Sequence, residues 1–173
     1  KNKSTNIVHI TPDAPKERVR KTPISRSVDI AFGRTLSLKD GPVNDLYRGI
    51  DMIYASNHKD EKRLACVLPI VGMSMRLILD VAARKYYEEN GSTKIARDQL
   101  YKEFLKEAKQ NMSQENKNFV SLTTGWLSDK ENMDGLLAKY AHGNITAQKN
   151  DILNASIIVG DILEVYFKKE KMK

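Results

Sequence analysis

The chain has 173 residues, of which 40% are hydrophobic and 29% charged, a composition typical of one globular domain with a real core. Its single cysteine, Cys66, excludes an internal disulfide and a cysteine-based zinc site, and its apolar helical surroundings predict a buried side chain. The longest apolar run, residues 64–81, falls short of the roughly 20 residues that span a bilayer and includes Pro69, Arg76 and Asp80. No apolar signal segment is visible. We therefore expect a cytoplasmic protein without a membrane anchor.

The formal net charge of +7 is concentrated at the start of the chain. Residues 1–28 contain seven Lys and Arg residues, two acidic residues and three prolines. This composition predicts an extended basic tail or linker over residues 1–40, ahead of a helical domain over residues 41–173. The candidates for contact with DNA or RNA phosphates are Lys16, Arg18, Arg20, Lys21 and Arg26. The alternative is a solvated linker. Within the tail, residues 28–38 alternate loosely and are expected to pack their apolar side chains on the body.

From Pro42 onward the hydrophobic pattern is helical. Pro42 suits the first turn of a helix over residues 43–56, because its ring fixes a helical φ. A longer helix is expected over residues 59–90, with Gly91 as its stop and Pro69 as a kink or a break. The centre of this long helix is apolar nearly all round, which is typical of a central helix in a bundle.

Serine and threonine residues are the expected caps of the helices after Gly91. They are Ser92 or Thr93 for a helix to about residue 111, Ser113 for the next, Ser128 for a helix over residues 129–141, and Thr146 for the last helix, to about residue 168. The predicted fold class is all-α, an up-and-down bundle of five to six helices behind the basic tail. The C-terminal helix carries more apolar surface than one stripe requires, which predicts a homodimer interface; the alternative is a fully buried helix.

His142 occupies the most distinctive position among the polar residues. The helix over residues 129–141 runs into His142, and Gly143 stops it directly afterwards. The imidazole then lies beside the negative end of the helix dipole, where it can act as a catalytic base, a pH-sensitive contact or a structural residue. The residues alone favour the structural role, with the ring bonded within the bundle.

Arg76 and Asp80 lie four residues apart on the most apolar helix and therefore share a face. The simpler interpretation is an ordinary salt bridge at the helix surface. The sharper alternative is that both residues meet His142 between helices in one polar cluster, which would make these three residues the candidate catalytic group.

The sequence offers no recognisable cofactor motif. The histidines His9, His58 and His142 lack metal-ligand spacing, and neither a glycine-rich phosphate loop nor a Gly-x-Ser-x-Gly nucleophile motif is present. We predict no cofactor and no metal.

Two short motifs carry a family resemblance. The run LLAKYAHGN, residues 136–144, together with RLILD, residues 76–80, resembles the HEPN-like superfamily of α-helical domains over residues 42–168. It is most similar to the non-catalytic helical modules at the C-terminal end of bacterial mobile-element and defence proteins. Ribonuclease members of the superfamily carry an Arg shortly before the His, and this chain has Leu136, Leu137 and Ala138 there. The resemblance implies a helical module that dimerises and serves a nucleic-acid-directed neighbour.

Three functions follow as hypotheses. The leading one is a non-enzymatic interaction or dimerisation module attached to a nucleic-acid-directed protein. The first alternative is a metal-independent ribonuclease of the HEPN type that uses His142, and the second is a DNA-binding module that acts through the basic tail.

Deletion of residues 1–28 tests the tail. If the tail binds phosphates, its removal abolishes salt-sensitive binding to a DNA duplex, because each phosphate contact releases roughly one counterion. Fluorescence anisotropy at low and high salt measures the binding, with the intact chain as the control. If binding survives the deletion, or if the intact chain does not bind DNA, the tail is a linker.

Overall fold

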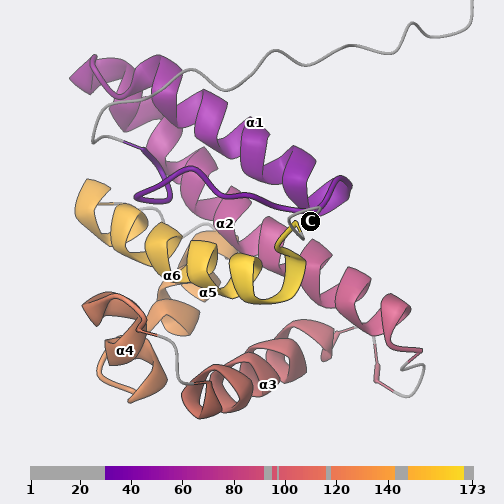
Figure 1. The fold of residues 1–173 in the computed structure, drawn as a ribbon. Helices are drawn as coiled ribbons and strands as arrows, with labels where there is room; N and C mark the ends of the chain where they lie inside the picture. Colours follow the sequence, from indigo (N-terminus) through magenta and orange to yellow (C-terminus); the bar gives the residue numbers. More distant parts are fainter. Residues whose placement is uncertain (1–29, 92–94, 97, 116–117, 143–147, 170–173) are drawn as a thin grey trace, which may run out of the picture.

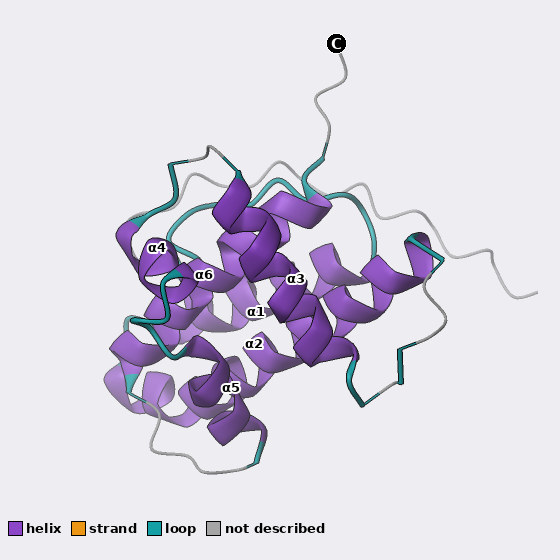
Figure 2. Ribbon diagram, turned by 90° about the horizontal axis from the view of Figure 1, so that it is seen from below, coloured by secondary structure: helices purple, strands orange, loops and turns teal. Residues whose placement is uncertain are grey.

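The fold is all-α, as predicted, in a computed structural model that describes residues 30–91, 95–96, 98–115, 118–142 and 148–169. These residues form six helices, and the longest of them lies at the centre of the fold (Figures 1 and 2). In chain order they are α1 (Pro42–Asn57), α2 (Glu61–Glu89), α3 (Leu100–Gln114), α4 (Ser121–Leu127), α5 (Met133–Ala141) and α6 (Lys149–Phe167).

The central element is α2, which packs against α1, α3, α5 and α6. Its N-terminus is capped by Asp60, whose carboxylate accepts hydrogen bonds from the backbone N–H groups of Lys62 and Arg63 at 3.0 and 3.1 Å. Its other end is followed by Gly91 with a φ of 65°, the left-handed conformation that suits glycine. Pro69 lies inside the helix and does not end it. The carbonyl that the proline ring leaves unbonded belongs to exposed Ala65, where water can reach it.

The prediction that Cys66 is buried is wrong, because its side chain is exposed. The apolar pattern of α2 extends nearly all round, but the other helices cover only one side of it. Cys66 lies on the uncovered side, so periodicity alone gave the wrong environment.

The predicted starts of α3 and α4 differ from those observed. Ser92 and Thr93 lie outside the described residues, and α3 begins only at Leu100. Ser113, expected to cap the following helix, lies inside α3, whose last turn is held on the core by fully buried Met112. The next helix, α4, starts after extended Val120.

The cap of α5 is Asn132 rather than Ser128. The Asn132 side-chain oxygen accepts a hydrogen bond from the N–H of Gly135 at 2.9 Å. Ser128 instead ends α4, and Asp129 after it has a φ of 58°, which breaks the helical path. The last helix, α6, begins at Lys149, while Thr146 lies outside the described residues.

The segment before α1 packs between α1 and α6, as Figure 1 shows in indigo. Phe32, Leu36 and Leu38 are buried there, which confirms that the segment covers the body. The backbone N–H of Leu36 donates to the Tyr47 hydroxyl at 2.9 Å. Leu38 forms an isolated antiparallel bridge with Lys168, just after α6. The start of the helical body is thereby fastened to its end.

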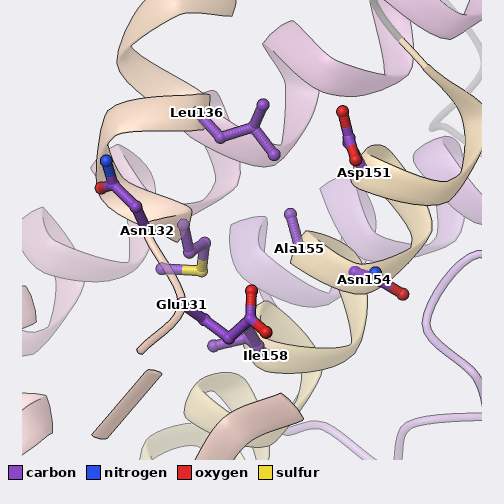
Figure 3. Close-up of a pocket in the computed structure, with 8 residues that line it drawn as sticks. Glu131, Asn132, Leu136, Asp151, Asn154, Ala155 and Ile158 are labelled. Carbon is purple, nitrogen blue, oxygen red and sulfur yellow. The ribbon is translucent and has the colours of Figure 1, made fainter. Parts of the chain in front are cut away.

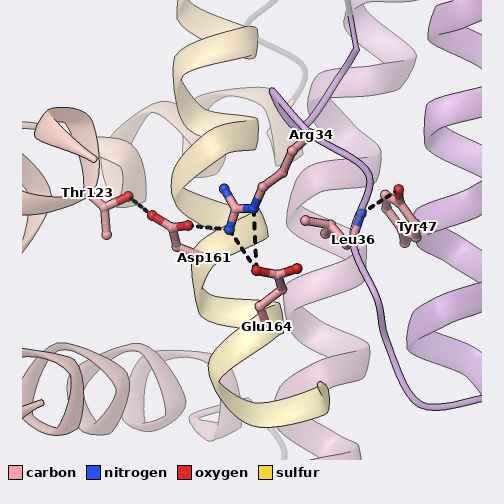
Figure 4. A network of polar contacts seen from close by, with 6 residues as sticks. All are labelled: Arg34, Leu36, Tyr47, Thr123, Asp161 and Glu164. Atoms are coloured by element: carbon pink, nitrogen blue, oxygen red, sulfur yellow. Dashed lines mark hydrogen bonds and ion pairs between the residues drawn. The ribbon is translucent and has the colours of Figure 1, made fainter. Parts of the chain in front are cut away.

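A buried carboxylate strengthens this attachment (Figure 4). Asp161 on α6 accepts from the Arg34 guanidinium through one oxygen and from the Thr123 hydroxyl through the other, both at 2.5 Å. Glu164 also accepts from Arg34, at 3.0 and 3.3 Å. Burial alone would lower the pKa of Arg34, but its hydrogen bonds to Asp161 and Glu164 outweigh that effect and raise the pKa. One carboxylate therefore joins the N-terminal segment, α4 and α6.

Asp161→Ala is expected to lower the free energy of unfolding by about 2 kcal/mol. The substitution removes the carboxylate that accepts hydrogen bonds from both Arg34 and Thr123 in a buried site. Urea unfolding followed by circular dichroism measures the change. Lys85→Ala, which removes the exposed Lys85–Glu89 pair, is the matched control and should cost less than about 0.5 kcal/mol. Equal effects of the two substitutions would contradict the structural role of Asp161.

Candidate functional site

Two of the three candidate catalytic residues form a direct pair on α2. The Nε and Nη2 atoms of Arg76 donate to the two carboxylate oxygens of Asp80, each at 3.1 Å. The side chains are 25% and 39% exposed, so the pair lies at the edge of the core rather than inside it. The bidentate geometry fixes the orientation of the Arg76 guanidinium.

The third candidate, His142, lies apart from that pair. It is the C-terminal cap of α5, where its backbone N–H contacts the carbonyls of Ala138 and Tyr140, and its side chain is exposed. Within the part of the chain that the structure describes, no hydrogen bond or ion pair joins His142 to Arg76 or Asp80. The sequence analysis favoured a His142 ring that is bonded within the bundle, and the exposure of His142 differs from that expectation.

The residue that anchors this end of α5 is Tyr140, which the sequence analysis did not single out. Tyr140 is 2% exposed, and its ring lies against Gly72 on α2. A Cβ at position 72 would stand 3.0 Å from the ring, so the contact requires glycine or a displacement. The sequence shows a glycine inside the apolar helix at position 72 and an aromatic residue at position 140. It does not show that these two distant positions are in contact.

A cleft of about 380 Å³ opens between α2, α3 and α5, beside the Arg76–Asp80 pair. The Arg76 guanidinium lies over the Tyr101 ring, with 3.2 Å between its central carbon and the ring centroid. Lys102, Lys106 and Lys109 line the α3 side of the cleft. The pair identified from sequence thus borders a cavity, together with α3 residues that the sequence analysis left out.

A second pocket, of about 240 Å³, lies between α5 and α6 (Figure 3). Glu131 and Asp151 contribute carboxylates, and Asn132 and Asn154 contribute amides. Across the described ranges, His, Cys, Asp and Glu side chains form no group of three or more that could hold a metal ion. This pocket has acceptors but lacks a set of metal ligands.

The most distinct surface feature is an apolar row on α2. Cys66, Ile70, Met73 and Leu77 are exposed and follow one another at intervals of four, three and four residues, so they lie on one side of the helix. We call these four residues the α2 outer face. The Ile70, Met73 and Leu77 side chains are 50%, 47% and 50% exposed, high values for apolar side chains.

Length and composition alone would allow α2 to cross a membrane, and no other helix in the described ranges passes that test. The core helix of a folded domain also passes it, and α2 buries one whole side against four other helices.

The described residues include only one of the two partner surfaces predicted from the sequence. In the predicted dimer helix, α6, Ile158, Val159 and Ile162 are at most 2% exposed and are buried inside the same chain, so dimerisation through α6 stays a prediction. The exposed large apolar side chains among the described residues lie on other elements, chiefly on α2. The basic residues proposed to contact nucleic acid (Lys16, Arg18, Arg20, Lys21 and Arg26) lie outside the described residues.

Comparison of the chain with protein-family models, with curated proteins and with solved structures finds no match. The resemblance to HEPN-like domains therefore stays a prediction from two short motifs.

The chain is expected to leave RNA intact, and His142→Ala is expected to change nothing. Among the described residues, no Arg or carboxylate forms a hydrogen bond or an ion pair with the exposed His142 ring, and general base catalysis by His142 would need such a partner. Incubation of single-stranded RNA with excess protein, followed by gel electrophoresis, measures cleavage. Cleavage by the wild type that His142→Ala abolishes would restore the ribonuclease alternative.

Proposed function

We propose that this chain is a non-enzymatic helical interaction module that self-associates through the α2 outer face. The observation that carries the proposal is the exposed apolar row on α2, in a helix whose opposite side forms the centre of the core. Exposed apolar side chains in one continuous row favour burial against a partner, because each one removed from water contributes roughly 1.5 to 3 kcal/mol.

The spacing of the row fits a second copy of the same helix. Intervals of four, three and four residues are those of a helix-pairing seam. Positions 66 and 77, and positions 70 and 73, are symmetric about one midpoint on the helix. Two antiparallel α2 helices related by a twofold axis there would place Cys66 against Leu77 and Ile70 against Met73 of the second copy.

Charge at the two ends of the row supports the same register. Arg63 precedes the row and Asp80 follows it, and these positions are symmetric about the same midpoint. Their side chains are 72% and 39% exposed. In the antiparallel pair, Arg63 of each copy meets Asp80 of the other. Asp80 already accepts from Arg76, and its two oxygens retain lone pairs for a second donor.

The non-enzymatic part of the proposal rests on the residues around His142. Leu136, Leu137 and Ala138 stand where ribonucleases of the resembled superfamily carry an Arg. The attachment to a nucleic-acid-directed protein rests on that resemblance and on the basic composition of residues 1–28, and it stays a prediction.

A Leu77→Cys variant tests both the association and its register. Cys66 of one copy would then face the new cysteine of the other, so mild oxidation should yield a disulfide-linked dimer on a non-reducing gel. Positions 66 and 77 of one helix are about 16 Å apart, too far for a bridge within one chain. The wild type, whose cysteines lie equally far apart in this register, should not be linked.

A Leu77→Lys variant tests the apolar contribution by sedimentation velocity at micromolar concentration. Two leucines are lost per dimer, so self-association should weaken by about a hundredfold, equivalent to roughly 3 kcal/mol. Met52→Lys changes an apolar residue on α1 that is 62% exposed, against 50% for Leu77, and is the matched control; it should leave the dimer unchanged. A monomeric wild type would overturn the proposal.

A further inference from the structure

The cleft between α2, α3 and α5 combines basic and apolar lining residues. Self-association through α2 does not require this combination. Arg76, Tyr101 and Leu105 form part of the lining of the cleft, and Asp134 and Ala138 line it on the α5 side. Its volume of about 380 Å³ lies within the range of about 300 to 1,000 Å³ that is usual for small-molecule sites. The cleft lies beside the α2 outer face, not on it.

The Arg76 guanidinium is held ready for an anion. Its Nε and Nη2 atoms are fixed by Asp80, and its flat face lies on the Tyr101 ring. Asp80 does not occupy the Nη1 edge of the guanidinium, and Arg76 lines the cleft. A guanidinium fixed on one edge loses little side-chain entropy when a ligand binds the other edge.

The Tyr101 ring is the surface on which the guanidinium lies. The residue is 7% exposed and its hydroxyl oxygen is buried, so Tyr101 contributes its ring rather than its hydroxyl to the lining of the cleft. Burial raises the pKa of Tyr101, and the nearby charge of Arg76 opposes that rise only in part. The hydroxyl therefore stays protonated at neutral pH and adds no negative charge beside the cleft.

Three lysines surround this centre. Lys102, Lys106 and Lys109 follow one another at helical spacing on α3, and all three line the cleft. Lys109 is engaged by Asp129 at 2.6 Å, and Lys106 is only loosely paired with Glu103, at 3.8 Å. Lysine acts on phosphate as a point charge, and several cations together favour a ligand with more than one negative charge.

We propose that this cleft binds an organic polyphosphate with an apolar body, such as a nucleotide. Lys102, Lys106 and the edge of Arg76 that faces away from Asp80 contact the phosphate oxygens. Leu105 and Ala138 contact its apolar part.

Isothermal titration calorimetry with ATP, at low salt and without divalent cations, tests the site. The wild-type chain should bind with a dissociation constant below about 1 mM. The double variant Lys102→Glu/Lys106→Glu changes two exposed residues and should weaken binding by at least about tenfold. Lys59→Glu, an exposed lysine in the turn before α2, is the matched control and should bind like the wild type.

Inorganic triphosphate distinguishes the phosphate chain from the apolar body. Its binding can be followed by fluorescence of Trp126, the only tryptophan in the sequence. The Trp126 Nε1 donates a hydrogen bond to cleft residue Asp134 at 3.0 Å, and the Trp126 ring centroid lies 5.1 Å from the Lys109 ammonium. We expect weaker binding than for ATP. Equal affinity would overturn the apolar contact, and the absence of binding by both ligands, or wild-type affinity in the double lysine variant, would overturn the proposal.

Discussion

The structure depends on the unequal covering of one helix. The sequence of α2 is apolar nearly all round, and its neighbours α1, α3, α5 and α6 cover only one side of it. The covered side organises the core, since α1, α3, α5 and α6 all pack directly on it. The uncovered side leaves Ile70, Met73 and Leu77 in water. The helix that organises the core therefore also carries the surface that we propose for self-association.

The parts of the fold that were predictable are those governed by local rules. Pro42 at a first helical turn and Gly91 after a last turn marked the ends of elements correctly, because each acts through its own backbone. Serine caps were predicted poorly: Ser113 lies inside α3 and Ser128 ends α4. A serine hydroxyl can cap a helix N-terminus only where a helix begins, and tertiary packing decides that position.

The candidate site shows the same division between local and distant information. Arg76 and Asp80 were paired from their spacing, because four residues on a helix place two side chains together. The position of Tyr101 under the Arg76 guanidinium depends on how α3 docks on α2, which no local pattern contains. Cys66 was misplaced for a related reason, since periodicity identifies an apolar side but does not say whether the rest of the chain covers it.

The contact between Gly72 and Tyr140 sets the distance between α2 and α5 close to the cleft. Gly72 lies one turn before Arg76 on α2, and Tyr140 lies close after Ala138 on α5, so this contact spaces two helices that line the cavity. An alanine at position 72 would force the ring to give by a few tenths of an ångström. A substitution at position 72, outside the cleft, would therefore change the spacing of its walls while every lining residue stays the same.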